Sequence, residues 1–102
     1  MKIAIAVTSS EEDAHVDRRG ARAPYYLILT TDSGLSKILS NPVSQDERRV
    51  GPQAAAFLVS EGVDEVVAGD FGPKFRAELE NNKITCTEMT GIASQVIDKL
   101  MS

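Results

Sequence analysis

Cysteine and histidine are almost missing from this sequence, which contains only Cys86 and His15. A single cysteine allows no disulfide within the chain and no cluster ligated by several thiolates of one chain. A Ser-His-Asp or Cys-His catalytic pair could use only His15, and no nucleophile-elbow pattern surrounds the nearby Ser9 and Ser10. We therefore expect His15 to be an exposed loop residue. We expect Cys86 to lie on a buried strand and to behave as a small apolar residue of low reactivity.

Long apolar runs and excess positive charge are also absent. No run approaches the roughly 18 residues that span a bilayer, and Met1 to Val7 lacks the features of a signal peptide. The net charge is −4, which excludes broad electrostatic binding to nucleic acid because that binding needs a basic face. We therefore expect a cytoplasmic location, with neither a membrane nor a nucleic acid as partner.

The composition is that of one globular domain. The chain has 102 residues, of which 42% are hydrophobic and 25% charged, and these values are typical of a folded domain with one core. The sequence contains no internal repeat, no low-complexity segment and no linker. We expect residues 1–102 to form a single domain that folds unaided.

Apolar runs alternate with turn and helix signals along the chain. Gly34 follows Asp32 and Ser33 between two apolar runs, which predicts a hairpin because glycine supplies the positive φ of the turn. Pro52 and Pro73 suit the first turns of two helices, and Gly62 suits the C′ position of the first of these. The predicted strands are 2–7, 25–31, 35–39, 65–68 and 84–87, and the predicted helices are 52–60, 73–81 and 93–101.

The order of these elements, β-β-β-α-β-α-β-α, predicts an α/β fold. Strands two and three should be antiparallel because they form a hairpin, whereas the later strands alternate with helices and should be parallel. The expected architecture is a three-layer α/β/α sandwich with a mixed five-stranded sheet. Strands one, three, four and five should then end at the same edge of the sheet, where open α/β sheets bind their ligands.

Five arginines fall in two of the loops at this edge. Arg18, Arg19 and Arg22 follow the first strand, and Arg48 and Arg49 precede the first helix. Two helices should also present their N-terminal N–H groups there. An anionic small ligand is therefore predicted. The alternative is that the arginines are solvated loop residues, some of them paired with the acids at 11–13 and 46–47, because surface ion pairs of this kind are common.

Several segments carry a family resemblance. Residues 1–7 (MKIAIAV), 16–26 (VDRRGARAPYY), 51–55 (GPQAA) and 62–69 (GVDEVVAG) resemble, in this order and spacing, the dinitrogenase iron-molybdenum cofactor biosynthesis family. The resemblance implies a ribonuclease H-like fold. Gly20 and Ala21 stand where the family usually has phenylalanine and glycine, and Arg19 stands where some relatives have histidine. In relatives that carry a cluster, loop histidines and cysteines can ligate it.

The resemblance implies a non-enzymatic binding or carrier module that holds an anionic metallocluster or its organic acid by ion pairing. An iron-sulfur or iron-molybdenum cluster, bound transiently, is the implied cofactor. The predicted ligand-contacting residues are Arg19, Arg22, Arg48 and Arg49, with Gly69 and Gly72 shaping the adjoining loop.

Two other classes of function stay open. The first alternative is a protein-interaction or regulatory adaptor that has the same fold and no cofactor, for which the partner is a protein. The second, which we favour least, is a metal-dependent nuclease. A nuclease would need several carboxylates gathered at the sheet edge, and Asp17, Asp70 and Glu88 are the candidates.

Overall fold

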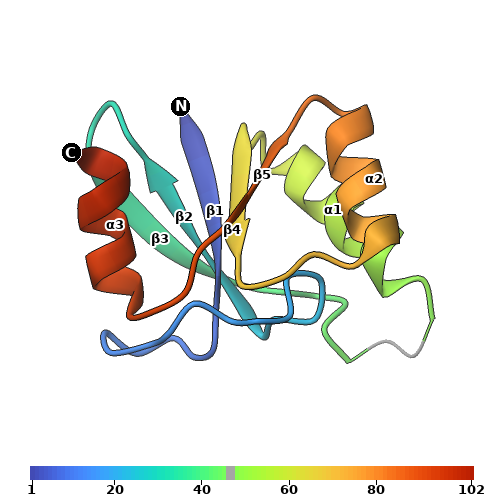
Figure 1. The fold of residues 1–102 in the computed structure, drawn as a ribbon, viewed down its shortest axis with the longest axis horizontal. Helices are drawn as coiled ribbons and strands as arrows, with labels where there is room; N and C mark the ends of the chain where they lie inside the picture. Colours follow the sequence, from blue (N-terminus) through green and yellow to red (C-terminus); the bar gives the residue numbers. More distant parts are fainter. Residues whose placement is uncertain (46–47) are drawn as a thin grey trace.

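The chain folds into three layers with a β-sheet in the middle (Figure 1). The computed structural model describes residues 1–45 and 48–102. The strands are β1 (Lys2–Val7), β2 (Tyr25–Thr30), β3 (Leu35–Ser40), β4 (Glu65–Ala68) and β5 (Thr85–Glu88). The helices are α1 (Val50–Ser60), α2 (Pro73–Asn81) and α3 (Ala93–Met101). The predicted order of elements is confirmed.

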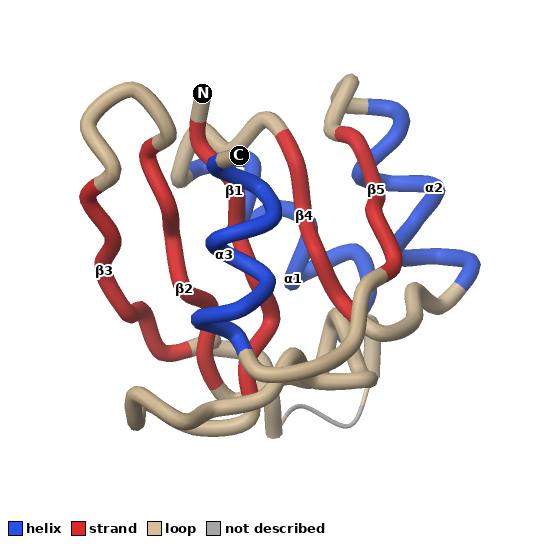
Figure 2. The backbone as a smooth tube through the Cα atoms, turned by 60° about the vertical axis from the view of Figure 1, so that its left-hand side comes forward, coloured by secondary structure: helices blue, strands red, loops and turns tan. Residues whose placement is uncertain are grey.

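The five strands form one mixed sheet in the order β3-β2-β1-β4-β5. β2 is antiparallel to both β1 and β3, while β1, β4 and β5 are parallel to one another. Helix α3 covers one face of the sheet, and α1 and α2 cover the other (Figure 2). This arrangement confirms the predicted mixed five-stranded α/β fold. It also brings the ends of β1, β3, β4 and β5 to the same edge of the sheet.

Strand β1 explains why its sequence shows no alternation, since both of its faces are buried. Ile3, Ile5 and Val7 belong to the core beneath α3, whereas Ala4 and Ala6 belong to the core beneath α1 and α2. Apolar side chains are favoured on both faces of such a central strand because both faces are removed from water.

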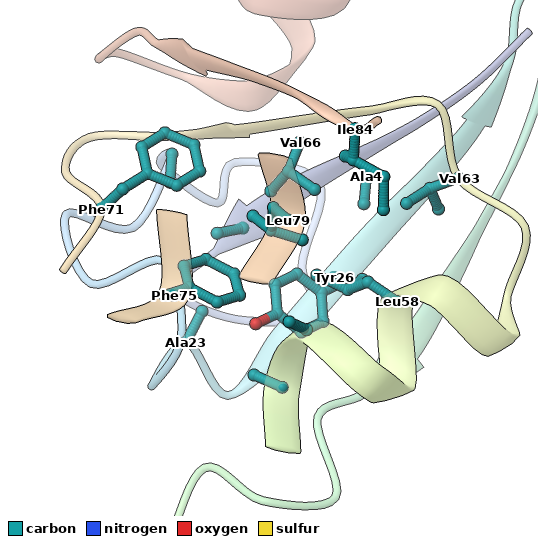
Figure 3. Packing of buried hydrophobic residues seen from close by; sticks show 14 of the residues in the cluster. Ala4, Ala23, Tyr26, Leu58, Val63, Val66, Phe71, Phe75, Leu79 and Ile84 are labelled. Atoms are coloured by element: carbon teal, nitrogen blue, oxygen red, sulfur yellow. The ribbon is translucent and has the colours of Figure 1, made fainter. Parts of the chain in front are cut away.

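The larger core lies beneath α1 and α2. The small side chain of Ala4 leaves room for bulky residues from other elements, namely Tyr26 of β2, Leu58 of α1 and Phe75 of α2 (Figure 3). Each of these three is at most 1% exposed. Burial of a side chain of this size stabilises the fold by about 1.5–3 kcal/mol, so this core fixes the two helices against the sheet.

The start of α1 and the setting of Cys86 differ from the predictions. Helix α1 begins at Val50, two residues before Pro52, because a proline in the first turn forfeits only an N–H that has no partner within the helix. Strand β5 lies at the edge of the sheet, and none of its four described residues is fully buried. The prediction that Cys86 lies on a buried strand is therefore wrong, since the residue is half-buried.

The turn predictions are confirmed. Gly34 has φ 72° in the hairpin and Gly62 has φ 75° directly after the end of α1, and both are conformations that glycine adopts at little cost. Within the described part of the chain, no helix has the length and apolar character that crossing a membrane requires.

Candidate functional site

The loop that follows β1 is held against the ends of two central strands by its backbone. The Asp17 N–H donates to the carbonyl of Ala6 at 2.7 Å, and the Gly69 N–H donates to the carbonyl of Asp17 at 2.9 Å. A β-carbon on Gly69 would lie 2.8 Å from Cα of Arg18. Only glycine at position 69 therefore lets this loop pass so close to the end of β4.

A buried carboxylate fixes the next residues of this loop. Asp17 is 3% exposed, and its Oδ1 accepts hydrogen bonds from the backbone N–H of Arg19 at 2.7 Å and from Nε of Arg19 at 3.2 Å. Its Oδ2 accepts from Nη2 of Arg19 at 3.2 Å. The hydrogen bonds that Arg19 donates to the Asp17 carboxylate raise the pKa of Arg19. Arg19 thus pairs with Asp17, which was not among the acids predicted as partners of the arginines. Two of those predicted partners, Asp46 and Glu47, lie outside the described residues.

Two buried polar side chains support the loop from below. The hydroxyl of Tyr26 donates to the carbonyl of Gly20 at 2.6 Å, and Nδ2 of Asn41 donates to the carbonyls of Ala21 and Ala23, each at 2.9 Å. Burial raises the pKa of the Tyr26 hydroxyl, so this donor keeps its proton across the physiological range. The backbone from position 20 to 23 is therefore held in one conformation.

The glycine at position 20 has a packing reason. A β-carbon there would lie 2.9 Å from the ring of Phe75 and 3.0 Å from the carbonyl oxygen of Asp70. The family that the sequence resembles usually has phenylalanine at this position. In this chain the ring of Phe75 from α2 lies against the same point of the loop and leaves no room for a side chain at position 20.

The N-termini of α1 and α2 meet beside this loop. A β-carbon on Gly51 would lie 3.0 Å from the backbone nitrogen of Phe75, so the first turns of the two helices are in close contact. The residue preceding α1 is Arg49, which has φ 57° and ψ 29°, and the residue preceding α2 is Gly72. Neither makes a side-chain capping bond, and neither first turn contains an acid. Two positive helix ends therefore lie side by side.

A cavity of about 520 Å³ lies where the loop and the two helix ends come together. We call it the edge cavity. Its charged lining residues are Arg22, Arg49 and Lys74. The rest of its lining is made by Ala21, Val50, Gly51, Pro52, Gly72, Pro73 and Phe75. Three cations and two helix N-termini thus surround one space, which favours an anionic occupant.

A second hollow of about 410 Å³ adjoins the edge cavity and shares Ala21, Arg22 and Gly72 with it. We call it the adjoining cavity. Its other lining residues are Arg18, Arg19, Gly20 and Asp70. Its described lining therefore includes a carboxylate, whereas the described lining of the edge cavity includes none.

The structure distributes the predicted site residues unevenly. Arg22, Arg49 and Gly72 line the edge cavity, and Arg19 lines the adjoining cavity. Arg48 is exposed and lines neither of these two cavities. Gly69 also lines neither, since it lies beneath the backbone of Arg18.

Lys74 is a cavity residue that the sequence reasoning did not identify. The signal for it was available, because Pro73 marks the start of a helix at the ligand-binding edge of the sheet. The residue that follows this proline must then lie at the same edge. Because the lysines are scattered along the sequence, Lys74 did not stand out as the lysine that the fold places beside the arginines.

Metal-ligating side chains do not gather in the described part of the chain. There, no group of three or more histidine, cysteine, aspartate or glutamate side chains is placed to hold a metal ion. Among the nuclease candidates, Asp17 bonds to Arg19, and Glu88 bonds to Arg76 at 3.0 Å. His15 is exposed, as predicted. The donor set of the edge cavity therefore suits an anion held by charge and hydrogen bonds, and it offers no thiolate or imidazole to a metal.

Cys86 is remote from this chemistry. It lies on β5 and packs against the core beneath α1 and α2. Burial raises the pKa of its thiol, and a thiol with a raised pKa is less nucleophilic at neutral pH because less of it is thiolate. The expected low reactivity of Cys86 agrees with this setting.

A third cavity, of about 450 Å³, lies at the N-terminus of α3 on the other face of the sheet. We call it the α3 cavity. Glu11 and Glu12 line it, together with Ser9, Ser10, Ser36, Ser94 and apolar residues. Its side-chain chemistry is thus acidic and hydroxylic, in contrast to that of the edge cavity.

Comparison with known proteins gives one family and several solved structures of similar fold. The family model described as dinitrogenase iron-molybdenum cofactor matches residues 1–102. The apo form of the orange protein from Desulfovibrio gigas superimposes with a TM-score of 0.85 at 22% identity, over 98% of this chain and 88% of that chain. A NifB-like protein of the DUF35 family from Thermotoga gives a TM-score of 0.82 at 27% identity, over 97% of this chain and 85% of that chain. No curated protein sequence matches significantly.

Proposed function

This chain belongs to the dinitrogenase iron-molybdenum cofactor family, and we propose that it is a non-enzymatic carrier that holds an anionic metallocluster in the edge cavity. Membership supports a cofactor-binding or carrier role in general. The observation that supports the finer proposal is the convergence of Arg22, Arg49 and Lys74 with the N-termini of α1 and α2 around one cavity.

The chemistry of the lining suits reversible binding. Guanidinium, ammonium and backbone N–H donors form charge-assisted hydrogen bonds with an anion, and these are about twice as strong as neutral ones. The described lining residues supply no thiolate or imidazole, so the cluster would be bound without a bond from the protein to its metal ions. We therefore propose that the cluster is cargo, bound whole and passed on.

The names of the similar structures agree with this role. One of them is described as a NifB-like protein, and the family itself is named for the iron-molybdenum cofactor. The proposal assigns no catalytic residue to this chain. A possible protein partner and a cytoplasmic location remain predictions from the sequence.

The test is uptake of isolated iron-molybdenum cofactor under anaerobic conditions, measured by equilibrium dialysis with iron and molybdenum analysis. Wild type should bind the cofactor stoichiometrically. The variant Arg22→Ala, Arg49→Ala, Lys74→Ala should bind at least about 100-fold more weakly, because a hydrogen bond to a charged group contributes about 1.5–3 kcal/mol.

The matched control is Lys37→Ala, Lys83→Ala, Lys99→Ala, which removes the same number of charges from exposed positions. It should bind as wild type does. If the control loses affinity equally, the effect is one of net charge and the site is misassigned. If wild type takes up no cofactor, the carrier proposal fails, and the adaptor without a cofactor becomes the better account.

A further inference from the structure

Strand β3 leaves one side of its backbone without a partner. It is the outermost strand of the sheet, beside β2 (Figure 2). The N–H of Asn41 donates to the carbonyl of Pro24 at 2.9 Å, which continues the antiparallel pairing of β2 with β3. Backbone groups of successive strand residues point to opposite sides, so the odd-numbered residues of β3 bond to β2. The N–H and carbonyl groups of Ser36, Ile38 and Ser40 therefore point away from the sheet, and they have no partner among the described residues.

This edge lacks the features that usually prevent a strand edge from pairing, namely charged side chains, proline, bulges and short length. Strand β3 has six residues, pairs with β2 without a bulge and contains no proline. Its one charged side chain, Lys37, lies 3.9 Å from Glu61, which follows α1. By contrast, β5 at the other edge has only four residues and ends in Glu88. Strand β3 is thus the edge to which a further strand can add.

The same strand borders the α3 cavity. The side chains of Ser36 and Ile38 line this cavity of about 450 Å³, and Ile38 is 38% exposed. The apolar part of the lining consists of Val7, Ala14, Leu27, Ile38, Ala93 and Ile97. Directly opposite residues of neighbouring strands have their side chains on the same face. A residue added opposite Ile38 would therefore direct its side chain towards this cavity, whose lining suits an apolar group.

The rim of the α3 cavity is negatively charged. Glu11 and Glu12 line it and are exposed, and among the described residues neither forms a salt bridge. The N-terminus of α3 supplies only about half a positive charge against these two carboxylates. The net charge of the chain is −4, so a basic partner is attracted whereas a second copy of the chain is repelled.

We propose that β3 and the α3 cavity together bind an extended basic segment of a partner protein, which adds to the sheet as an antiparallel strand. Antiparallel pairing is the more stable kind per residue. The segment would place an apolar residue opposite Ile38 and a lysine or arginine opposite Ser40. Through β2, Ser40 lies in register with Val7, at the end of β1 from which the loop with Glu11 and Glu12 leaves. This surface is separate from the edge cavity, so binding there does not depend on the proposed cargo.

The experiment is an NMR titration of the ¹⁵N-labelled chain with the blocked peptide acetyl-Thr-Lys-Thr-Ile-Thr-Val-Thr-amide. In an extended strand its lysine, isoleucine and valine lie on one face. Binding should saturate, with the largest changes in amide chemical shift at Ser36, Ile38, Glu11 and Glu12. Hydrogen exchange at Ser36 and Ile38 should become slower. Shift changes centred elsewhere, or no saturable binding up to about 5 mM, would overturn the proposal.

Two matched peptides distinguish strand addition from simple attraction. N-methylation of the isoleucine removes the N–H that would donate to the carbonyl of Ile38 and leaves the charge and the side chains unchanged. It should weaken binding at least about tenfold. Replacing the lysine by glutamate should weaken binding at least about fivefold, because that side chain would face Glu11 and Glu12. If either peptide binds as tightly as the first, the proposal is wrong.

A pair of protein variants tests the acidic rim. Glu11→Gln, Glu12→Gln should bind the lysine peptide at least about threefold more weakly than wild type. The matched control is Glu78→Gln, Glu80→Gln, which removes the same charge from exposed positions on α2 and should bind as wild type does. Equal loss of affinity in the two variants would mean that net charge alone attracts the peptide, contrary to the proposal.

A second copy of the chain is the alternative occupant of β3. Sedimentation equilibrium and hydrogen exchange on the free protein test it. A monomer with fast exchange at Ser36 and Ile38 is expected. A dimer in which these two amides are already protected would show that β3 pairs with itself, and the proposal of a basic partner would fail.

Discussion

The N-terminus of α3 differs from the paired N-termini of α1 and α2 in the groups that surround its free N–H groups. At α3, the N–H of Ala93 donates to the carbonyl of Ala14 at 2.9 Å, and Glu11 and Glu12 line the cavity beside it. At α1 and α2, the first turns contain no acid and the neighbouring side chains are cations. One helix end is satisfied by its own chain. The other two keep a positive potential that favours an anion from outside.

The backbone conformation of the residue that precedes the helix also differs between α3 and α1. Ile92, which precedes α3, has φ −75° and ψ 133°, a conformation that any residue adopts readily. Arg49, which precedes α1, has φ 57° and ψ 29°, which costs a residue with a β-carbon about 1–2 kcal/mol. Strain of this kind is concentrated at binding sites. The comparison therefore agrees with the proposal that an anion binds on the α1 and α2 side of the sheet.

The largest change in stability is expected from a substitution at Gly69, where the loop that carries Arg22 crosses the end of β4. Gly69→Ala should lower the free energy of unfolding by about 2–3 kcal/mol, because its β-carbon would collide with the backbone of Arg18. Urea unfolding measures the change. Gly72→Ala is the matched control, since a β-carbon there meets nothing within 4 Å, and it should change stability by less than about 0.5 kcal/mol. Equal effects would show that the close passage at position 69 is not limiting.

Substitutions at Arg49 test whether its left-handed backbone conformation is strained. Arg49→Gly and Arg49→Ala both remove the guanidinium, so both should weaken binding of the cofactor equally. Glycine adopts the left-handed conformation without the steric cost, and Arg49→Gly should therefore be about 1–2 kcal/mol more stable than Arg49→Ala. Thermal unfolding of the two proteins gives this difference. If their midpoints coincide, the backbone at position 49 is unstrained in solution.

Gly72→Asp should make the α2 end resemble the α3 end. Gly72 has an extended backbone and open space around its α-carbon, so an aspartate can cap the helix and interact with its dipole. Stability should rise by about 0.5–1 kcal/mol. Uptake of the cofactor should be lost, because a carboxylate then occupies the positive end. A stabilised variant that still binds the anion would place the site elsewhere.

The smallest change in stability is expected from substitutions in the α3 cavity. Glu11→Gln, Glu12→Gln should lower stability by about 0.3–0.5 kcal/mol, since the two charges interact favourably with the N-terminus of α3 only near the surface. Cofactor uptake should not change. Chemical denaturation and the dialysis assay, run on the same sample, test both statements. A gain in cofactor affinity would mean that the charge of these glutamates acts on the edge cavity across the sheet.

Much of the fold could be predicted because its signals are local. The structure has the predicted bounds for β1, β4, α2 and α3. Their signals are the apolar run of β1, the β-branched run of β4 that ends at Gly69, and the proline that opens α2. The start of α1 was predicted too late because Pro52 permits two more helical residues before it. The setting of Cys86 was wrong because exposure on β5 depends on which strand forms the edge of the sheet, which a short apolar run does not reveal.

The position of the proposed site could be derived from the topology, but the residues that line its cavity could not all be derived from the sequence. Topology alone placed the two arginine loops at one edge of the sheet. Which arginine points into a cavity depends on distances that sequence does not carry: Arg19 is held by Asp17 at 3.2 Å, and Arg48 lies outside both cavities at that edge. The packing role of Gly69 is likewise tertiary, since Arg18 and Gly69 are remote in sequence and become neighbours only in the fold.

The close contact between Gly51 and Phe75 bears on how readily a ligand could come and go. Because the two helix ends touch through backbone atoms, the N–H groups beside the cavity are already in place before any ligand arrives. Binding then orders only a few exposed side chains, which lowers its entropic cost. Release likewise requires no rearrangement of the core. A rigid frame with exposed charged side chains agrees with the proposed role of a carrier, which must both hold and release its cargo.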